Sequence, residues 1–427
     1  MRSPSFSRTP RAASRGSTSP WTVARSPTSI SSRPSRTVSD VVLRIAVIGA
    51  GTVGVGAARR AAELGAEVTV VDREGPASGS SGRSAAIYNV QTVDPLHVEL
   101  RTRARELFFE LERTRGLPLR KIGNLRVAWT DADLEVLRGV IDVQRGLGLT
   151  EEDSVILDRD GIQRLVPDLV TRDLAGGLFG PRDGVIDGVY LSHTLLHSAI
   201  DRGARYVKAR VLDHRKRGSE HVLVTEQGEI VADVVVNAAG AWAGKVGAIL
   251  GIEVPVMPQV HDIVKARLPE ARPYTVPMVN LYMPGSDGEA LYFRQLDPTT
   301  LLAGFHTYEV LEDQPIVDPD DFRQVVEPSY TEAVRAALAE RFPVPGIEVV
   351  PGWTGLYPLS PDGEFIIGPE TGDPTIVTAT GLGGVGVTSG SMAGYLAAEW
   401  AVLGETTTMT GVERWLPSRF ETKGAVA

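Results

Sequence analysis

The chain has 427 residues, of which 42% are hydrophobic and 23% are charged, and it contains no cysteine. This composition is typical of a globular protein large enough for two domains, and it excludes disulfides, thiolate metal sites, cysteine nucleophiles and cysteine-linked cofactors. The net charge of −9 makes nucleic acid an unexpected partner. No stretch of sequence predicts a transmembrane span, and we expect a cytoplasmic protein.

Residues 1–40 are rich in Ser, Arg, Pro and Thr and contain almost nothing that could be buried. Such a segment is predicted to be disordered, because it cannot offset the entropy cost of ordering. It has the composition of a transit peptide. We favour a second interpretation, a misassigned translation start with the protein beginning near Val41 or Val42.

Residues 44–72 predict a strand, a glycine-rich turn, a helix and a second strand. The turn is Gly49-Ala50-Gly51-Thr52-Val53-Gly54. Its first glycine permits the tight turn, the second leaves room for a pyrophosphate, and the third lets the helix pack against the strand. The second strand ends in Asp72, which could accept a hydrogen bond from an unphosphorylated ribose, so NADP is disfavoured. The motif predicts a dinucleotide site but does not distinguish NAD from FAD.

Three further segments contain runs of small residues, at 74–91, 230–251 and 375–404. The first is a Gly/Ser loop, the second a buried strand that runs into a turn, and the third a strand, a turn and a helix starting around Thr388. The helix N-terminus offers unpaired N–H groups and a positive dipole, which would stabilise a reduced flavin. A nicotinamide domain would instead continue in alternating strands and helices. These segments favour FAD.

Elements of a different character lie between these segments. Residues 95–116 have the pattern of an amphipathic helix, and residues 123–130 predict a strand. The stretches 290–296 and 301–308 flank Asp297-Pro298-Thr299-Thr300 and predict a hairpin.

The order and spacing of six motifs resemble the D-amino-acid oxidase superfamily of FAD enzymes, which includes sarcosine oxidase, glycine oxidase, D-arginine dehydrogenase and dimethylglycine dehydrogenase. The motifs are "GAGTVG…VVDRE", "SSGRSAA", "VVVNAAGAWA", "LYFRQ", "GWTGLYPLSPDGEFIIGP" and "TGLGGVGVTSGSMAG". The resemblance implies an α/β fold in which a Rossmann-like FAD-binding domain is interleaved with an α+β substrate domain built on a mostly antiparallel sheet. The FAD-binding domain would comprise residues 41–115, 183–254 and 351–405, and the substrate domain residues 116–182 and 255–350. Residues 406–427 would form a C-terminal tail.

The resemblance also implies the residues that bind FAD. These are Gly49, Gly51, Thr52, Val53, Gly54, Asp72, Arg73, Ser81, Arg83, Ser84, Ala239, Gly240, Trp242, Gly381, Gly383, Gly384, Val385, Gly386, Val387 and Thr388. We expect non-covalent FAD, because the chain has no cysteine and the loop "GSSGRSAA" lacks the histidine that links flavin in dimethylglycine dehydrogenase.

Five residues are candidates for the substrate site. Tyr292 and Arg294 are two apart on a predicted strand and share a face. By resemblance, Tyr292 and Tyr88 would line the substrate cavity, His306 would lie near the flavin, and His261 would lie at the entry of the substrate domain. Arg294 could hold a substrate carboxylate or point outward from the hairpin, and His306 could instead be a hydrogen-bonded sheet residue.

Some positions depart from the relatives. Leu302 and Thr388 stand where sarcosine oxidase has lysines, and Tyr357 stands where D-arginine dehydrogenase has an arginine. These departures leave oxidase and dehydrogenase activity both open. His193 and His197 are four residues apart, but without a third ligand they predict a helix surface rather than a metal site.

The sequence therefore predicts an FAD-dependent oxidoreductase that oxidises the C–N bond of a small amine or amino acid of the sarcosine, glycine, dimethylglycine or D-amino-acid type. Hydride would pass to flavin N5, and the electrons would then go to oxygen or to a separate acceptor. One alternative is a 2-hydroxy acid dehydrogenase or oxidase with His306 as its base. Others are a non-catalytic flavin-binding subunit and a nicotinamide-dependent dehydrogenase. The substrate and the oligomeric state are not fixed by the sequence.

Overall fold

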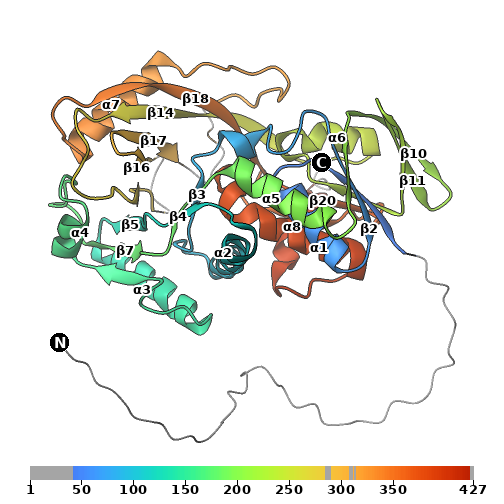
Figure 1. Cartoon of the computed structure of the whole chain (residues 1–427), viewed down its shortest axis with the longest axis horizontal. Helices are drawn as coiled ribbons and strands as arrows, with labels where there is room; N and C mark the ends of the chain where they lie inside the picture. Colours follow the sequence, from blue (N-terminus) through green and yellow to red (C-terminus); the bar gives the residue numbers. More distant parts are fainter. Residues whose placement is uncertain (1–41, 284–289, 307–310, 312–313, 424–427) are drawn as a thin grey trace, which may run out of the picture. The chain divides into compact units, whose positions relative to one another are not determined.

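The computed structural model describes residues 42–283, 290–306, 311 and 314–423. The predicted tail at residues 1–40 and the last two residues of the strand predicted at 301–308 lie outside the described residues. The described chain is built around two large sheets, one in each half of Figure 1.

A six-stranded, mostly parallel sheet contains the two strands predicted around the glycine-rich turn. Its spatial order is β19 (Ile366–Pro369), β20 (Ile376–Thr380), β13 (Val234–Asn237), β1 (Arg44–Ile48), β2 (Glu67–Asp72) and β9 (Arg205–Lys208). Only β19 runs antiparallel to its neighbour. The central strands β1 and β13 are buried and mostly apolar, as expected for a parallel sheet covered on both faces.

Helices cover one face of this sheet. They are α1 (Thr52–Glu63), α2 (Pro95–Arg115), α5 (Gly188–Ile200) and α8 (Gly386–Leu403), and their apolar residues share one core with Ile45 and Val47 of β1. The opposite face, with Ala46 and Ile48, packs on α6 (Ala243–Leu250) and on a small sheet of β10 (Val211–Arg217), β11 (Glu220–Thr225) and β12 (Gly228–Ala232).

The contact between α1 and α8 depends on glycine. A Cβ at Gly394 would lie 2.1 Å from the carbonyl oxygen of Val53, and one at Gly56 would lie 2.4 Å from the carbonyl oxygen of Ser391. Any larger side chain would force the helices apart. This close approach fixes the N-terminus of α8 against the turn that begins α1.

The second sheet has eight strands and is antiparallel except where β5 and β15 pair in parallel. Its order is β18 (Glu348–Leu359), β14 (Met257–Arg267), β17 (Thr300–His306), β16 (Ala290–Asp297), β15 (Met278–Asn280), β5 (Asn124–Ala128), β7 (Gly176–Gly180) and β6 (Val155–Leu157). The predicted hairpin is confirmed as β16 and β17. The mostly antiparallel sheet expected for the substrate side is therefore present.

Alternation along these strands gives the sheet two different faces. Leu125, Val279, Phe293 and Ala303 belong to one face and pack in a core with α4 (Arg159–Leu165) and α7 (Pro328–Arg341). Helix α3 (Asp131–Gly146) packs near one end of this sheet, against α2. The other face carries polar residues and is described below.

A third, small sheet connects these parts. It consists of β3 (Ile87–Tyr88), β8 (Gly184–Ile186) and β4 (Leu119–Arg120). Helix α2 follows β3; it is capped by the side chain of Asp94 and ends at Gly116, which has φ 69°. Both ends agree with the predicted helix at 95–116.

The two sheets draw on separate stretches of the chain. Seven strands of the eight-stranded sheet, including β16 and β17, lie inside the predicted substrate ranges 116–182 and 255–350. The eighth, β18, crosses the predicted boundary at residue 351. Residues 406–423 are folded, and Trp415 among them is fully buried. The division into two domains stays a prediction, because residues 42–427 cluster as one unit.

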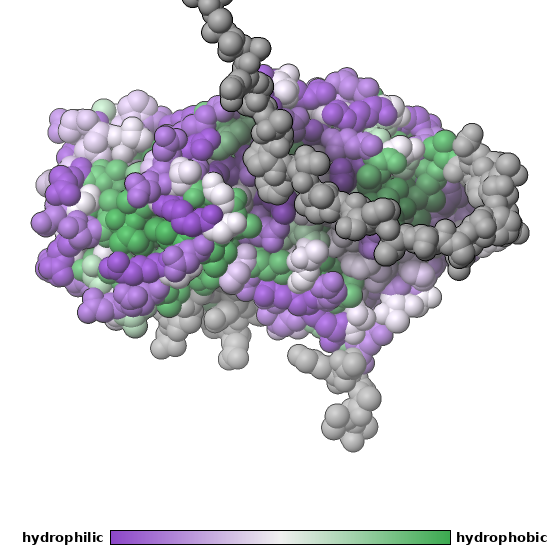
Figure 2. Space-filling view, turned by 90° about the horizontal axis from the view of Figure 1, so that it is seen from below, coloured by the Kyte–Doolittle hydropathy of each residue, from purple (hydrophilic) through white to green (hydrophobic). Residues whose placement is uncertain are grey.

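The face seen in Figure 2 mixes hydrophilic residues with apolar patches. Large apolar side chains that are exposed in the described chain include Tyr190 and Ile200 on α5 and Val136 on α3. Isolated apolar residues of this kind are common on protein surfaces. None of the helices in the described part of the chain combines the length and apolar character needed to cross a membrane.

Candidate active site

A cavity of about 610 Å³ lies between the carboxyl ends of the six-stranded sheet and the polar face of the eight-stranded sheet. Its lining runs from the turn at Gly49 and Gly51, through Asp72 and the loop 78–87, to His306 and Thr388. Ligands of open α/β sheets bind at this edge, where neighbouring strands end.

The glycine-rich turn has the geometry that its sequence predicts. Gly49 has φ 109°, and a Cβ there would lie 2.5 Å from the carbonyl oxygen of Ala238. A Cβ at Gly54 would lie 1.9 Å from the carbonyl oxygen of Gly49. Asp72 also stabilises the turn, because its carboxylate accepts hydrogen bonds from the N–H groups of Ala50 at 2.8 Å and Gly75 at 2.8 Å.

Hydrogen bonds join the glycine-rich turn to two of the three small-residue segments around the cavity. Thr52 donates its N–H to the hydroxyl of Ser81 at 3.2 Å and its own hydroxyl to the carbonyl of Gly386 at 2.9 Å. The first turn of α8, at Gly386, Val387 and Thr388, therefore borders the cavity with its N–H groups and positive dipole. This end of the cavity favours a negatively charged group.

Most of the predicted cofactor residues line this cavity. They are Gly49, Gly51, Thr52, Val53, Asp72, Arg73, Ser81, Arg83, Ser84, Ala239, Gly240, Trp242, Gly383, Gly384, Val385, Gly386, Val387 and Thr388. Gly54 lies behind the turn, where it allows α1 to approach Gly49, and Gly381 lies in the turn after β20 with φ 78°. These two glycines shape the site without lining it.

Four residues of the segment 314–327, which lies between β17 and α7, line the cavity; we call this segment the strap. Asp320 of the strap accepts hydrogen bonds from the indole N–H of Trp242 at 2.7 Å and from Lys245 at 2.6 Å, and it pairs with Arg73 at 2.5 Å. The guanidinium of Arg73 also lies 4.6 Å from the ring of Trp242. The strap thus contacts the part of the cavity that follows Asp72.

Strand register explains the polar face at the other end of the cavity. Neighbouring strands place Arg126 beside Asn280, Asn280 beside Tyr292, and His261 beside Gly355. Each belongs to the alternating set that faces away from α4 and α7. All of these residues line the cavity.

The two histidines of this face are buried and hold no charge at neutral pH. Burial lowers the pKa of His306 to about 3, and the nearby cations Arg126 and Arg101 add to the effect. Burial also lowers the pKa of His261 to about 3. The ring of His261 stacks on Tyr357 with 3.7 Å between centroids, and its Nε2 has no hydrogen-bond partner among the described residues.

The structure brings three of the five substrate-site candidates into the cavity. Tyr292, His306 and His261 line it. Tyr88 is fully buried, packs edge-on against Phe108 and donates its hydroxyl to the carbonyl of Arg182 at 3.1 Å. The side chain of Tyr88 therefore packs in the core and does not line the cavity, and Tyr88 is not part of the proposed substrate site.

Arg294 is buried rather than exposed on the outer face of the hairpin. Its Nε donates to the carbonyl of Ala85 at 2.7 Å and its Nη1 to the carbonyl of Gln295 at 3.0 Å. The indole of Trp353 similarly donates to the carbonyl of Arg83 at 2.6 Å. Through its hydrogen bond to Ala85, Arg294 therefore links the loop 78–87 to the eight-stranded sheet, and it does not line the cavity.

Residues 44–400 match the family DAO, described as FAD dependent oxidoreductase. The chain belongs to this family. Over 373 residues it is 25% identical to glycine oxidase of Geobacillus kaustophilus, covering 85% of the chain and 93% of that protein. It is 26% identical over 377 residues to human mitochondrial dimethylglycine dehydrogenase, covering 84% of the chain but only 42% of that longer protein. The crystal structure of L-proline dehydrogenase from P. horikoshii has the same fold, with a TM-score of 0.78, 24% identity, and coverage of 90% and 98%.

The residues of this DAO family member fit FAD. The turn at Gly49 would hold the pyrophosphate, Asp72 would face the ribose, and the N-terminus of α8 would face the flavin ring. Gly51 lines the cavity, and a Cβ there would lie 3.2 Å from the hydroxyl of Ser81, so a larger side chain would crowd this part of the site. The protein is an FAD-dependent oxidoreductase.

Two arginines that line the cavity were not predicted from the sequence. Arg126 lies on β5 and Arg101 on α2, and they are 1% and 2% exposed. Arg126 interrupts the apolar run "NLRVA", a signal that could have indicated a buried charge with a specific task. Arg101 carries no such signal, because α2 contains several arginines.

His193 and His197 stand one turn apart on α5, with 6.1 Å between ring centroids, and both are exposed. In the described ranges no group of three or more His, Cys, Asp or Glu side chains could hold a metal ion.

Proposed function

We propose that this flavoprotein oxidises the C–N bond of a small amine that carries a carboxylate, of the glycine, sarcosine, dimethylglycine or D-amino-acid type. The observation that carries the proposal is the presence of Arg101 and Arg126 in the same cavity as His306 and the N-terminus of α8. The named relatives glycine oxidase and dimethylglycine dehydrogenase support this substrate class.

The two arginines would bind the carboxylate. A guanidinium offers planar paired donors that match a carboxylate, and the interaction is strong where water is excluded. Both guanidiniums are already held: Arg126 donates Nη1 to the carbonyl of Tyr282 at 2.7 Å, and Arg101 donates Nη1 to the side-chain oxygen of Asn89 at 3.0 Å. A fixed anchor of this kind sets which carbon of the substrate faces the cofactor.

The remaining wall of the substrate site would accept a neutral amine. His306 and His261 are uncharged near pH 7, since burial lowers both pKa values to about 3. Tyr292 and Tyr357 add ring surfaces that exclude water. FAD, when bound, takes up the two electrons and the hydrogen that leave the substrate carbon. A base is not required if the amine binds in its deprotonated form.

Oxidation of a 2-hydroxy acid is less well supported. It requires removal of a hydroxyl proton, and His306 would be the base. A histidine with a pKa of about 3 is a weak base at neutral pH.

The test is an absorption spectrum of the purified protein, recorded without oxygen before and after adding substrates. The panel is glycine, sarcosine, dimethylglycine, D-alanine and L-proline, with lactate and glycolate as hydroxy acids. We expect a flavin spectrum that the amino acids bleach and the hydroxy acids leave unchanged. Bleaching by the hydroxy acids alone would contradict the proposal, as would a flavin that no compound reduces. Admitting air then distinguishes an oxidase from a dehydrogenase that needs another acceptor.

A further inference from the structure

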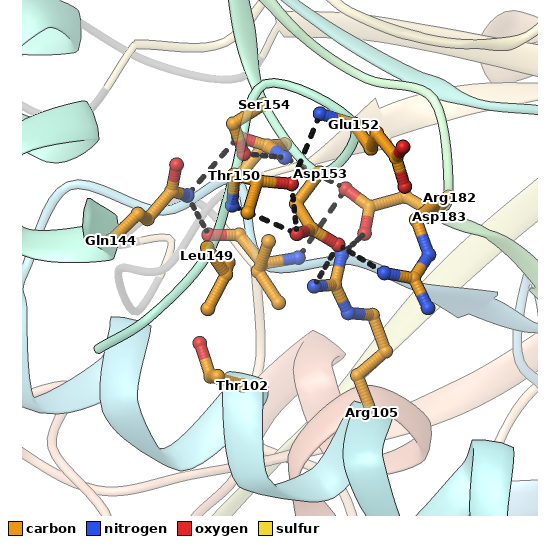
Figure 3. A network of polar contacts seen from close by, with 12 residues as sticks. Thr102, Arg105, Gln144, Leu149, Thr150, Glu152, Asp153, Ser154, Arg182 and Asp183 are labelled. Carbon is orange, nitrogen blue, oxygen red and sulfur yellow. Dashed lines mark hydrogen bonds and ion pairs between the residues drawn. The ribbon is translucent and has the colours of Figure 1, made fainter. Parts of the chain in front are cut away.

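A buried polar network connects α2, the start of β8 and the loop 150–154. Figure 3 shows Arg105 reaching from α2 to two carboxylates. It donates to Asp183 at 3.2 Å and to Asp153 at 2.9 Å. The side chain of Asp183 is 0% exposed, and burial raises its pKa to about 6 although Arg105 opposes the shift. Neither carboxylate lines the cavity.

On one side this network holds the segment Asn89–Gln91. The Oδ2 atom of Asp183 accepts hydrogen bonds from the side-chain amide of Gln91 at 2.9 Å and from the N–H of Val90 at 3.4 Å. Gln144 of α3 donates its amide to the carbonyl of Val90 at 3.0 Å. A buried network with these partners rigidifies the backbone that it holds.

On its other side the same segment holds both cavity arginines. The side-chain oxygen of Asn89 accepts from Arg101 at 3.0 Å, and the carbonyl of Gln91 accepts from Nε of Arg126 at 3.1 Å. Arg101 and Arg105 are four residues apart on α2 and project from one side of the helix. One helix therefore supplies both an arginine of the cavity and an arginine of the network.

A third contact relates the segment to the flavin end of the cavity. The N–H of Asn89 donates to the hydroxyl of Thr388 at 3.1 Å, and that hydroxyl donates to the carbonyl of Asn89 at 3.2 Å. Thr388 belongs to the first turn of α8. Segment 89–91 thus contacts the arginines, the network and the cofactor helix at once.

We propose that Asp183 and Gln91 are positioning residues for the substrate carboxylate. They fix segment 89–91, which in turn sets Arg101 and Arg126 relative to the flavin. The side chains of Asp183 and Gln91 pack tightly against the backbone of Gly180, because a Cβ at Gly180 would lie 2.3 Å from both Asp183 Oδ2 and Gln91 Nε2. The inference rests on the proposed function, because it takes the two arginines as carboxylate ligands.

Two variants test the role. Asp183→Asn must turn an NH₂ group either towards Arg105 or towards Gln91 and Val90, so a donor faces a donor on one side. Gln91→Met keeps the volume but removes the amide. Asp153→Asn is the matched control: it removes the other carboxylate of Arg105 without touching segment 89–91.

The readout is anaerobic reduction of the bound flavin by glycine, sarcosine, D-alanine and L-proline and by their methyl esters. For the two test variants we expect Kd for the acids to rise about tenfold, the change that 1.4 kcal/mol produces. The limiting rate of reduction and Kd for the esters should stay close to wild type. Asp153→Asn should keep the wild-type ratio of acid to ester Kd.

The outcomes separate the two claims. If wild type binds esters as tightly as acids, the carboxylate part of the proposed function is wrong. If wild type prefers acids and both test variants keep that preference, the positioning role is wrong. If Asp153→Asn loses the preference for acids over esters as much as the test variants do, the positioning role is also wrong. The effect would then follow from disturbing Arg105 alone. Gln91→Met decides the matter if Asp183→Asn does not fold.

Discussion

Two arginines of the eight-stranded sheet are similarly buried but have different surroundings. Arg126 and Arg294 both lie on the polar face of the eight-stranded sheet, and both are nearly inaccessible to solvent. Arg126 lines the cavity, whereas Arg294 is bonded to the carbonyl of Ala85 in the cofactor loop. Equal burial therefore serves two different tasks.

Replacing these two arginines should give different losses. We expect Arg126→Met to raise Kd for the amino-acid substrate by roughly 100-fold while FAD content stays normal, since a buried charge-assisted pair is lost. Arg294→Met should keep the ratio of acid to ester Kd but release FAD faster, because the loop 78–87 loses an anchor. Flavin reduction and FAD fluorescence measure the two effects. Loss of the acid preference in Arg294→Met alone would restore Arg294 as the carboxylate ligand.

Two helix glycines should respond to alanine with opposite signs. Gly394→Ala inserts a methyl group 2.1 Å from the carbonyl of Val53, and we expect the free energy of unfolding to fall by about 2 kcal/mol or more. In Gly139→Ala of α3 the added methyl group meets nothing within 4 Å, so the higher helix propensity of alanine should raise the free energy of unfolding by about 0.5–1 kcal/mol. Denaturant unfolding of the holoprotein measures both. A neutral Gly394→Ala would show that α1 and α8 can separate without cost.

At the scale of elements, the strap follows β17 of the eight-stranded sheet and contacts Arg73, Trp242 and Lys245 beside the cavity. Asp320 pairs with Arg73 and Lys245, and these cations hold the pKa of its carboxyl well below the usual range. We expect Asp320→Asn to speed dissociation of FAD severalfold. Dissociation from wild type should become faster with added salt, because partly exposed ion pairs are screened.

The neighbouring Asp321→Asn is the control for the strap. Asp321 is exposed, and its side chain makes no ion pair with the described residues. Release of FAD, followed by the recovery of its fluorescence, should match wild type in this variant. Identical release rates in Asp320→Asn and Asp321→Asn would contradict a role for the strap in holding the cofactor.

The elements that local sequence determines were predicted well. The strand and turn at Gly49, the helix capped by Asp94 and the hairpin of β16 and β17 follow from glycine spacing, capping and alternation. Helix α8 begins at Gly386, two residues before the predicted Thr388. The C-terminal residues predicted as a tail include Trp415, which is buried. The local sequence pattern does not show that this aromatic side chain packs against the rest of the chain.

The arrangement of the substrate site could not be predicted in the same way. Arg126 reaches the cavity because β5 pairs in parallel with β15, which places it beside Asn280. Arg101 joins it only because α2 packs along segment 89–91. Such pairings depend on contacts between distant parts of the chain, for which a single sequence contains no direct signal.

At the scale of the whole molecule, buried histidines make stability depend on pH. Burial lowers the pKa of His221 to about 4 and those of His261 and His306 to about 3. An unfolded histidine has a pKa of about 6.5, so the unfolded chain binds more protons below that value. The part of the free energy of unfolding that depends on these uncharged histidines is fully present above about pH 6.5 and is lost as the pH falls towards 4. Asp183, with its raised pKa, acts in the opposite direction and cancels part of this loss.

We therefore expect the free energy of unfolding to fall between pH 7 and 5, by at most about 1.4 kcal/mol per pH unit for each histidine. His221→Gln should flatten this slope. His197→Gln should leave it unchanged, since His197 is exposed on α5. Denaturant titrations at several pH values measure the slope. A wild-type curve that is flat over this range would mean that the histidines are charged in the folded protein.

The alternation of the chain between its two sheets has a consequence for biosynthesis. Ile45 pairs with Val234, and Val235 pairs with Ile376, so the six-stranded sheet joins strands that lie far apart in the chain and are made at different times. Helix α8, whose first turn borders the cavity, is translated after every strand of both sheets. The eight-stranded sheet has all its strands once β18 is made, whereas the six-stranded sheet still lacks β19 and β20. We therefore expect the cavity to be completed late in synthesis, and a nascent chain stalled before Gly386 to expose apolar residues that α8 covers in the finished protein.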